Sequence, residues 1–360
     1  MILEEYAKYN AIEKCRIYAS EFDHTIYPKN FELMGHPDGT LGDIDGDPRI
    51  TVFLVEGVGS YYLQHNELPF TTYSNNREMV FVNSNMELYN TIEVICHETN
   101  HLFLFNYDLN EGRYFIEGLA EFSTYYVGYR NNYSFVQWSE VSLNSTHTSY
   151  FFSHYPDASM LFFDETYHSS ASYGASYMFL LYVSEKYGMN IISELVPIDE
   201  LDGPEALEYV LSSNGYNISF NEVFLNFITA STIDQLGIYD DLYGFVNTEF
   251  QIYERRYIRS FPSNSIDTLY RYYGTNVQEL VEPLDEFTLQ IETPASPQSL
   301  GLSAVIFDEN GYNISQTILT GTGNTTYLYF TGENIESVYI ITSMIKEGTP
   351  NSIREWMPSP

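Results

Sequence analysis

Cysteines, basic residues and long apolar runs are scarce in this sequence. The two cysteines, Cys15 and Cys96, are too few for a disulfide framework. Cys96 lies in an apolar segment, where we expect a buried free thiol. No stretch approaches the roughly 18 continuous apolar residues of a membrane-spanning helix, so we expect no membrane insertion.

The shortage of positive charge excludes nucleic acids and anionic membrane surfaces as partners. Only 15 Lys and Arg residues stand against 49 Asp and Glu residues, which gives a formal net charge of −34. Nucleic acids and anionic membrane surfaces bind clustered basic side chains, which this chain lacks. A charge of this size suits high salt, abundant divalent cations or acid, where carboxylates are screened or neutralised. Nothing in the sequence indicates an oligomeric state.

The N-terminus is not of the signal-peptide type. Residues 1–16, MILEEYAKYNAIEKCR, form an amphipathic pattern that includes acidic residues and has no apolar core. Two interpretations follow: a protein that stays inside the cell, or the mature form of an exported one.

The residues that are abundant predict an ordered α+β protein. With 44% hydrophobic and 17% aromatic residues, the chain of 360 residues can bury a core in one large or two ordinary domains. β-branched and aromatic runs predict strands at 50–57 and 78–85, whereas residues 131–170 are irregular. Helical periodicity predicts helices over the first 20 residues or so and at 86–105, 113–128, 171–188, 203–215 and 219–231.

The pattern changes near residue 262. Short alternating runs follow one another at 286–293, 302–311, 314–321, 325–332 and 337–345. Such runs, separated by turn residues, are typical of a small antiparallel sandwich or barrel. We therefore expect two domains, residues 1–261 and 262–360, of which the second is a small all-β sandwich.

Residues 97–101, HETNH, have the spacing of a metal site. On a helix, His97 and His101 project from the same face one turn apart, and a tetrahedral Zn²⁺ can take both imidazoles. Glu98 points to the side, where it can reach a water at the metal without ligating the ion. On this motif alone, a helix with two incidental histidines remains the alternative.

A second motif, FIEGLAEF at 115–122, offers the third ligand. Glu117 and Glu121 lie four apart on one face of a predicted helix, so one carboxylate can ligate the metal while the other orients a histidine. The extended metzincin pattern is excluded, because it would place Gly and His where this chain has Leu104 and Tyr107.

HETNH followed by FIEGLAEF resembles the glutamate-zincin metallopeptidases of the thermolysin-like clan. The chain is most similar to the hyicolysin family, over roughly residues 20–260, on the segments DIDGDPRITVFLVE, NREMVFVNSN and YGASYMFLLYVSEKYG. The resemblance implies a thermolysin-like catalytic domain, in which a mixed sheet and a zinc helix precede a helical subdomain. It also implies a zinc endopeptidase that acts on polypeptides outside the cell or at its surface.

The resemblance assigns Glu117, the residue before Gly118, as the third zinc ligand and Glu121 as the carboxylate that orients a histidine. Two departures from the family pattern concern this assignment. The interval after the histidine pair is shorter than in the best-known members, whose spacing would make Glu121 the ligand. Phe115-Ile116 stands where Trp-Leu is usual. The local E-G-L-A-E match favours Glu117.

The implied reaction is hydrolysis of a peptide bond, with Glu98 as the general base for a water activated by zinc. A further donor must stabilise the oxyanion of the tetrahedral intermediate. Candidates are Tyr173, Tyr177, His154 and His168. We expect Tyr173, because a Tyr followed by Gly at a helix start recurs in related zincins.

Two features near the first strands complete the prediction. We expect the strand at 78–85 to border the cleft and to pair with an extended substrate backbone. Asp43, Asp45 and Asp47 of GDIDGDP could hold a structural Ca²⁺, but a tight Asx turn entering the strand is the favoured interpretation.

Two other functions stay open. A catalytically silent surface-binding protein could retain the zinc scaffold, although the intact Glu98 argues against loss of catalysis. An aminopeptidase needs acidic groups for the free amine of its substrate, such as a G-x-M-E-N segment, and NREMVFVNSNME does not supply one. An endopeptidase is therefore favoured.

Overall fold

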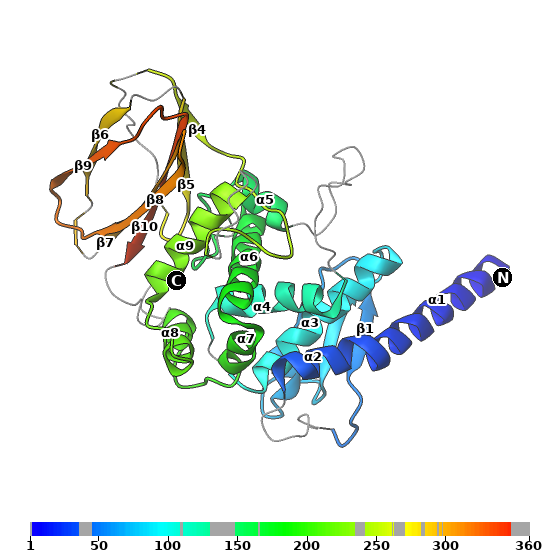
Figure 1. Ribbon diagram of the computed structural model, residues 1–360. Helices are drawn as coiled ribbons and strands as arrows, with labels where there is room; N and C mark the ends of the chain where they lie inside the picture. Colours follow the sequence, from blue (N-terminus) through cyan, green and yellow to red (C-terminus); the bar gives the residue numbers. More distant parts are fainter. Residues whose placement is uncertain are drawn as a thin grey trace.

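The computed structural model describes most of the chain and shows a mixed α+β protein, as predicted (Figure 1). Of residues 2–9 only the backbone is described. The described residues are 2–35, 45–108, 111–129, 148–164, 166–234, 242–260, 262, 271–281, 285–293, 295–296 and 298–346.

The chain begins with nearly continuous helix. Helix α1 (Ile2–Glu21), the π-helical segment η1 (Phe22–Ile26) and α2 (Tyr27–Met34) follow one another. Figure 1 shows the start of α1 extending away from the other elements. Phe22 and Ile26 are buried, so η1 connects this helix to the core. The helix predicted over the first 20 residues is confirmed.

A three-stranded mixed sheet precedes the metal motif. Strand β1 (Thr51–Val55) runs parallel to β3 (Met79–Asn83), and β2 (Tyr61–Tyr62) runs antiparallel to β3 on its other side. The order β1-β3-β2 places β3 in the centre. The prediction that the strand at 78–85 pairs with substrate is therefore wrong, because its hydrogen-bonding edges are taken by β1 and β2. The edge strands are β1 and β2.

The GDIDGDP segment is described from Asp45 onward. One oxygen of the Asp45 carboxylate accepts a hydrogen bond from the backbone N–H of Asp47 at 2.8 Å, and the other accepts one from Arg77 Nε at 2.8 Å. The first contact is an Asx turn, which confirms the favoured interpretation. Asp43 lies outside the described residues, and the Ca²⁺ site stays a prediction.

Helices make up most of residues 88–233. Their bounds confirm the predicted helices to within a few residues, and α5 falls in the stretch 131–170, where the sequence shows no regular pattern. No described helix has the length and apolarity needed to cross a membrane. The helices are α3 (Leu88–Phe105), α4 (Arg113–Val127), α5 (Thr148–His154), α6 (Ser169–Tyr187), α7 (Met189–Leu195), α8 (Gly203–Ser213) and α9 (Phe220–Ile233).

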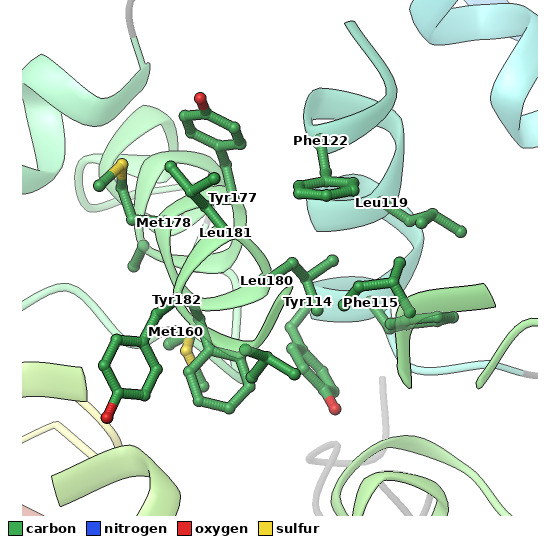
Figure 2. Packing of buried hydrophobic residues seen from close by; sticks show 14 of the residues in the cluster. Tyr114, Phe115, Leu119, Phe122, Met160, Tyr177, Met178, Leu180, Leu181 and Tyr182 are labelled. Atoms are coloured by element: carbon green, nitrogen blue, oxygen red, sulfur yellow. The ribbon is translucent and has the colours of Figure 1, made fainter. Parts of the chain in front are cut away.

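Helices α4 and α6 pack closely against each other. Figure 2 shows Leu119 and Phe122 of α4 beside Tyr177 and Leu180 of α6. These side chains are buried, and burial of each large apolar side chain contributes roughly 1.5–3 kcal/mol. A glycine sets the closeness of the contact: a Cβ built at Gly118 would lie 3.0 Å from the Ser176 Cβ. This contact brings the start of α6 beside the second acidic motif.

The C-terminal part is built from two sheets, which are antiparallel except for one parallel pair in the larger sheet. The five predicted strands are all present. Strand β6 (Glu286–Glu292) pairs with β9 (Thr325–Thr331). The larger sheet has the order β4 (Arg256–Ile258), β5 (Asn276–Val281), β10 (Ser337–Lys346), β7 (Gln298–Asp308) and β8 (Gly311–Leu319), with only β4 and β5 parallel.

The central strands β7 and β10 of the larger sheet are buried on both faces. Along β10, Val338 and Ile340 face the β6–β9 pair, whereas Tyr339 and Ile341 belong to the core shared with the helices. This alternation is the two-residue period of a strand. Strand β4 joins this sheet although it precedes residue 262, and the domain boundary near 262 stays a prediction.

Candidate metal centre

Helices α3 and α4 bring three donor atoms together. The Nε2 atoms of His97 and His101 lie 3.1 Å apart. Oε2 of Glu117 lies 3.5 Å from the first of these nitrogens and 3.4 Å from the second. The histidines come from one face of α3, and the carboxylate comes from α4, which packs against it.

These distances fit a tetrahedral metal ion. Metal–ligand bonds of about 2.0–2.1 Å at tetrahedral angles place neighbouring donors about 3.3 Å apart, close to the three observed distances. The three side chains are only 12–16% exposed, so water competes weakly for the donors. Two imidazoles and one carboxylate leave a fourth position for a further ligand. The residues present therefore fit a divalent metal ion.

Glu121 lies behind His97 rather than beside the other donors. Its Oε1 is 3.6 Å from Nδ1 of His97, the ring nitrogen that does not face Glu117. Its Oε2 accepts a hydrogen bond from Thr148 Oγ1 at 3.1 Å. A carboxylate at Nδ1 favours the tautomer that leaves Nε2 free to bind a metal. The geometry thus favours Glu117 as the ligand and Glu121 as the orienting group.

Thr148 contributes to this centre through Glu121, although no pattern in the sequence points to it. It begins α5, in the stretch without a regular pattern, and it reaches Glu121 across 27 residues of sequence. The close approach depends on Gly174 of α6, where a Cβ would lie 2.0 Å from the Thr148 carbonyl oxygen. The Y-G pair at 173–174 was the available signal for a tight contact, but it did not indicate the partner.

The carboxylates give this centre a negative electrostatic potential. Burial acts to lower the pKa of His97, but the nearby Glu117, Glu98 and Glu121 outweigh it and raise the pKa to about 9. Burial acts to raise the pKa of Glu117, but its contacts with His101 and His97 hold that pKa well below its usual range. The same negative potential that favours a proton on His97 favours a bound cation.

A cavity of about 360 Å³ opens beside the three donors. This volume lies within the range of small-ligand sites. Glu98 lines the cavity and is only 6% exposed, and Tyr173 lines it from α6. The remaining lining residues come from β2, α3, α4 and the adjoining loops: Ser60, Tyr61, Tyr62, Gln64, His97, His101, Leu104, Phe105, Asp108, Ile116 and Glu117.

Tyr173 is the one of the four candidate oxyanion donors that lines this cavity. Tyr177 is buried against Tyr125 in the core. His154 bonds within α5, and His168 stacks on Tyr155. Burial raises the pKa of Tyr173 above its usual value, so the phenol keeps its proton at neutral pH and can donate it.

Comparison with protein-family models and with curated proteins gives no match to this chain. The functional conclusion therefore depends on the two motifs and on the geometry of the residues that they bring together.

Proposed function

We propose that the chain is a zinc-dependent endopeptidase. The observation that carries the proposal is the tetrahedral spacing of donors from His97, His101 and Glu117 beside a cavity lined by Glu98. Two histidines and a carboxylate with an open fourth position form a ligand set of catalytic zinc. The resemblance of HETNH and FIEGLAEF to the glutamate zincins, and to the hyicolysin family among them, supports the same conclusion.

The proposal includes a thermolysin-like catalytic domain. The sheet and α3 would form one lobe, and helices α4 to α9 would form the other. The lining of the cavity supports this arrangement, because β2 and α3 contribute from one side and α4 and α6 contribute from the other.

The chemistry is peptide hydrolysis. Zn²⁺, when bound, supplies Lewis acidity that polarises a carbonyl and lowers the pKa of a water. Glu98 accepts the proton of that water and passes it to the leaving amine, a role that its position in the cavity allows. Tyr173 donates its O–H to the oxygen on which negative charge develops.

Polypeptides are the proposed substrates. Strand β2 forms one edge of the N-terminal sheet, and its residues Tyr61 and Tyr62 line the cavity. An extended peptide can add to such an edge through main-chain hydrogen bonds, which do not depend on its sequence. A location outside the cell or at its surface is part of the proposal.

The test compares the wild type with Glu98→Gln. Both proteins are purified without chelator, their metal content is measured by mass spectrometry, and cleavage of casein and of a quenched fluorescent peptide is followed. We expect about one zinc per chain in both and a roughly 10²–10⁴-fold loss of cleavage in the variant. Absence of zinc from the wild type would overturn the proposal. Zinc without Glu98-dependent cleavage would indicate a binding protein that keeps the scaffold.

One observation supports an aminopeptidase of the same clan as the second candidate. The buried Asp108 lines the cavity, where a carboxylate can bind a free amine. Peptides with free and with acetylated N-termini separate the two functions. We expect cleavage of both by an endopeptidase, whereas an aminopeptidase would cleave only the free form.

A further inference from the structure

Arg113 occupies a position that the electrostatics of its helix disfavour. It is the first residue of α4, where the helix dipole favours negative charge, and no acidic residue stands in that first turn. Cations are also rare in this chain, with 15 basic residues against 49 acidic ones. Other contacts of the guanidinium must therefore account for its place beside the candidate metal centre.

The contacts of Arg113 join two residues of the site. Its Nη2 donates to the hydroxyl of Tyr173 at 3.4 Å, and its Nε lies 3.8 Å from Oε1 of Glu117. The guanidinium lies over the ring of Phe163, 5.1 Å from its centre. The same ring meets Tyr173 edge-on, with 5.0 Å between the ring centres. Phe163 thus holds both partners of the Arg113–Tyr173 contact.

The direction of this hydrogen bond determines what Tyr173 can do. A guanidinium has only donors, so the phenol oxygen must act as the acceptor. The O–H of Tyr173 is then left to donate away from Arg113, toward the Glu117 carboxylate or toward a group bound in the cavity. The two oxygens of Glu117 are divided in the same way, since Oε2 faces the histidines and Oε1 faces Arg113.

We propose that Arg113 is a positioning residue that orients the Tyr173 hydroxyl for the developing oxyanion. The inference rests on the proposed endopeptidase function and adds that the oxyanion donor is an Arg113–Tyr173 pair rather than Tyr173 alone. Because the guanidinium acts through Tyr173, its removal should have little effect once the hydroxyl is gone.

A double-mutant cycle tests this dependence. Arg113→Met, Tyr173→Phe and the double variant are assayed with a quenched fluorescent peptide, and Arg16→Met on the exposed face of α1 is the control. We expect kcat to fall about 10²-fold in Tyr173→Phe and about tenfold in Arg113→Met, with KM and zinc content nearly unchanged. The double variant should be no slower than Tyr173→Phe, and Arg113→Lys should recover part of the loss. Losses that multiply in the double variant would overturn the inference.

A second measurement does not depend on activity. The protein is labelled with 3-fluorotyrosine, and the ¹⁹F resonance of residue 173 is assigned by its absence in Tyr173→Phe. We expect Arg113→Met to shift or broaden this resonance, whereas Arg16→Met leaves it in place. An unchanged resonance in Arg113→Met would overturn the inference. If Arg113→Met shifts the resonance but the wild-type protein cleaves no peptide, the result would support the Arg113–Tyr173 contact and overturn the proposed endopeptidase function.

Discussion

Two glutamates four residues apart take different places around His97. Glu117 faces Nε2 of the imidazole and Glu121 faces Nδ1, so one turn of α4 spans the two nitrogens of one ring. The two residues have the same chemistry and lie on the same helix face. They differ in which nitrogen of the His97 ring each of them faces.

This difference predicts unequal effects on metal binding. Glu117→Ala should lose bound zinc, because it removes a donor atom. Glu121→Ala should keep the three donors and weaken zinc affinity about 10–100-fold. Competition with a chromophoric chelator measures both affinities. Loss of zinc from Glu121→Ala together with retention by Glu117→Ala would reverse the assignment.

Loss of the Thr148 hydroxyl should have a smaller and more specific effect on zinc affinity. Thr148→Val removes the hydroxyl that bonds to Glu121 while it keeps the shape of the side chain. A hydrogen bond to a charged group contributes about 1.5–3 kcal/mol, only part of which should reach the metal. We therefore expect a weaker zinc affinity than in the wild type but a stronger one than in Glu121→Ala. Thr148→Ser retains the hydroxyl and serves as the control in the same chelator titration.

At the level of elements, small residues set the distance between the helices that carry the site. Gly118 of α4 meets Ser176 of α6, and Gly174 of α6 meets the backbone of Thr148. Side chains at either glycine would separate elements that carry Glu117, Glu121 and Tyr173. The positions of the functional groups thus depend on residues that have no side chain.

Gly174→Ala tests this dependence. The added Cβ would lie 2.0 Å from a backbone oxygen, so the start of α6 or of α5 must move. We expect unfolding in urea to become easier by about 1–3 kcal/mol, with a loss of peptide cleavage. Gly59→Ala is the matched control, because its Cβ would meet nothing within 4 Å. Equal stability of the two variants would contradict the proposed packing constraint.

On the scale of the whole molecule, acidic residues far outnumber basic ones, and some of their carboxyl groups are buried. The protonation of a buried carboxyl group affects the stability of the fold. Glu111 accepts hydrogen bonds from the backbone N–H groups of Gly112 and Gly203, and so ties the start of α4 to the start of α8. Burial raises the pKa of Glu111 to about 8, although these bonds act against the shift. The folded protein therefore holds a proton at Glu111 that the unfolded chain releases above its ordinary pKa of 4.5.

The sign of the resulting pH dependence follows from linkage. The folded state binds the additional proton between about pH 4.5 and 8, so the stability that Glu111 contributes is complete at the lower limit and is lost as the pH rises through 8. We expect the free energy of unfolding to fall over this window by at most about 1.4 kcal/mol per pH unit for one group. The free energy of unfolding, measured by urea denaturation at several pH values, should fall less steeply with pH in Glu111→Gln than in Glu13→Gln, a control whose side chain on α1 is 39% exposed. An unchanged slope in Glu111→Gln would contradict this account.

Much of the fold is predictable because its signals are local. Helices α3, α4, α6, α8 and α9 and the C-terminal strands show their periods in consecutive residues, and the structure confirms them. The central place of β3 was not predictable, because the pairing partner β2 is two residues long and carries no pattern of its own. Helix α5 was not predicted for a similar reason, since its seven residues make too few turns to show a period.

The sequence by itself determined that His97 and His101 share one helix face, with Glu98 between them and two further carboxylates on a nearby helix. Spacing within one helix is sufficient for this, since neighbours along the chain have known relative directions. Only the tertiary structure decided that Glu117 and not Glu121 faces the Nε2 atoms, and that Arg113 and Phe163 hold Tyr173. These contacts depend on how α4 and α6 pack beside α3, and interhelical packing arises from the whole core rather than from any local pattern.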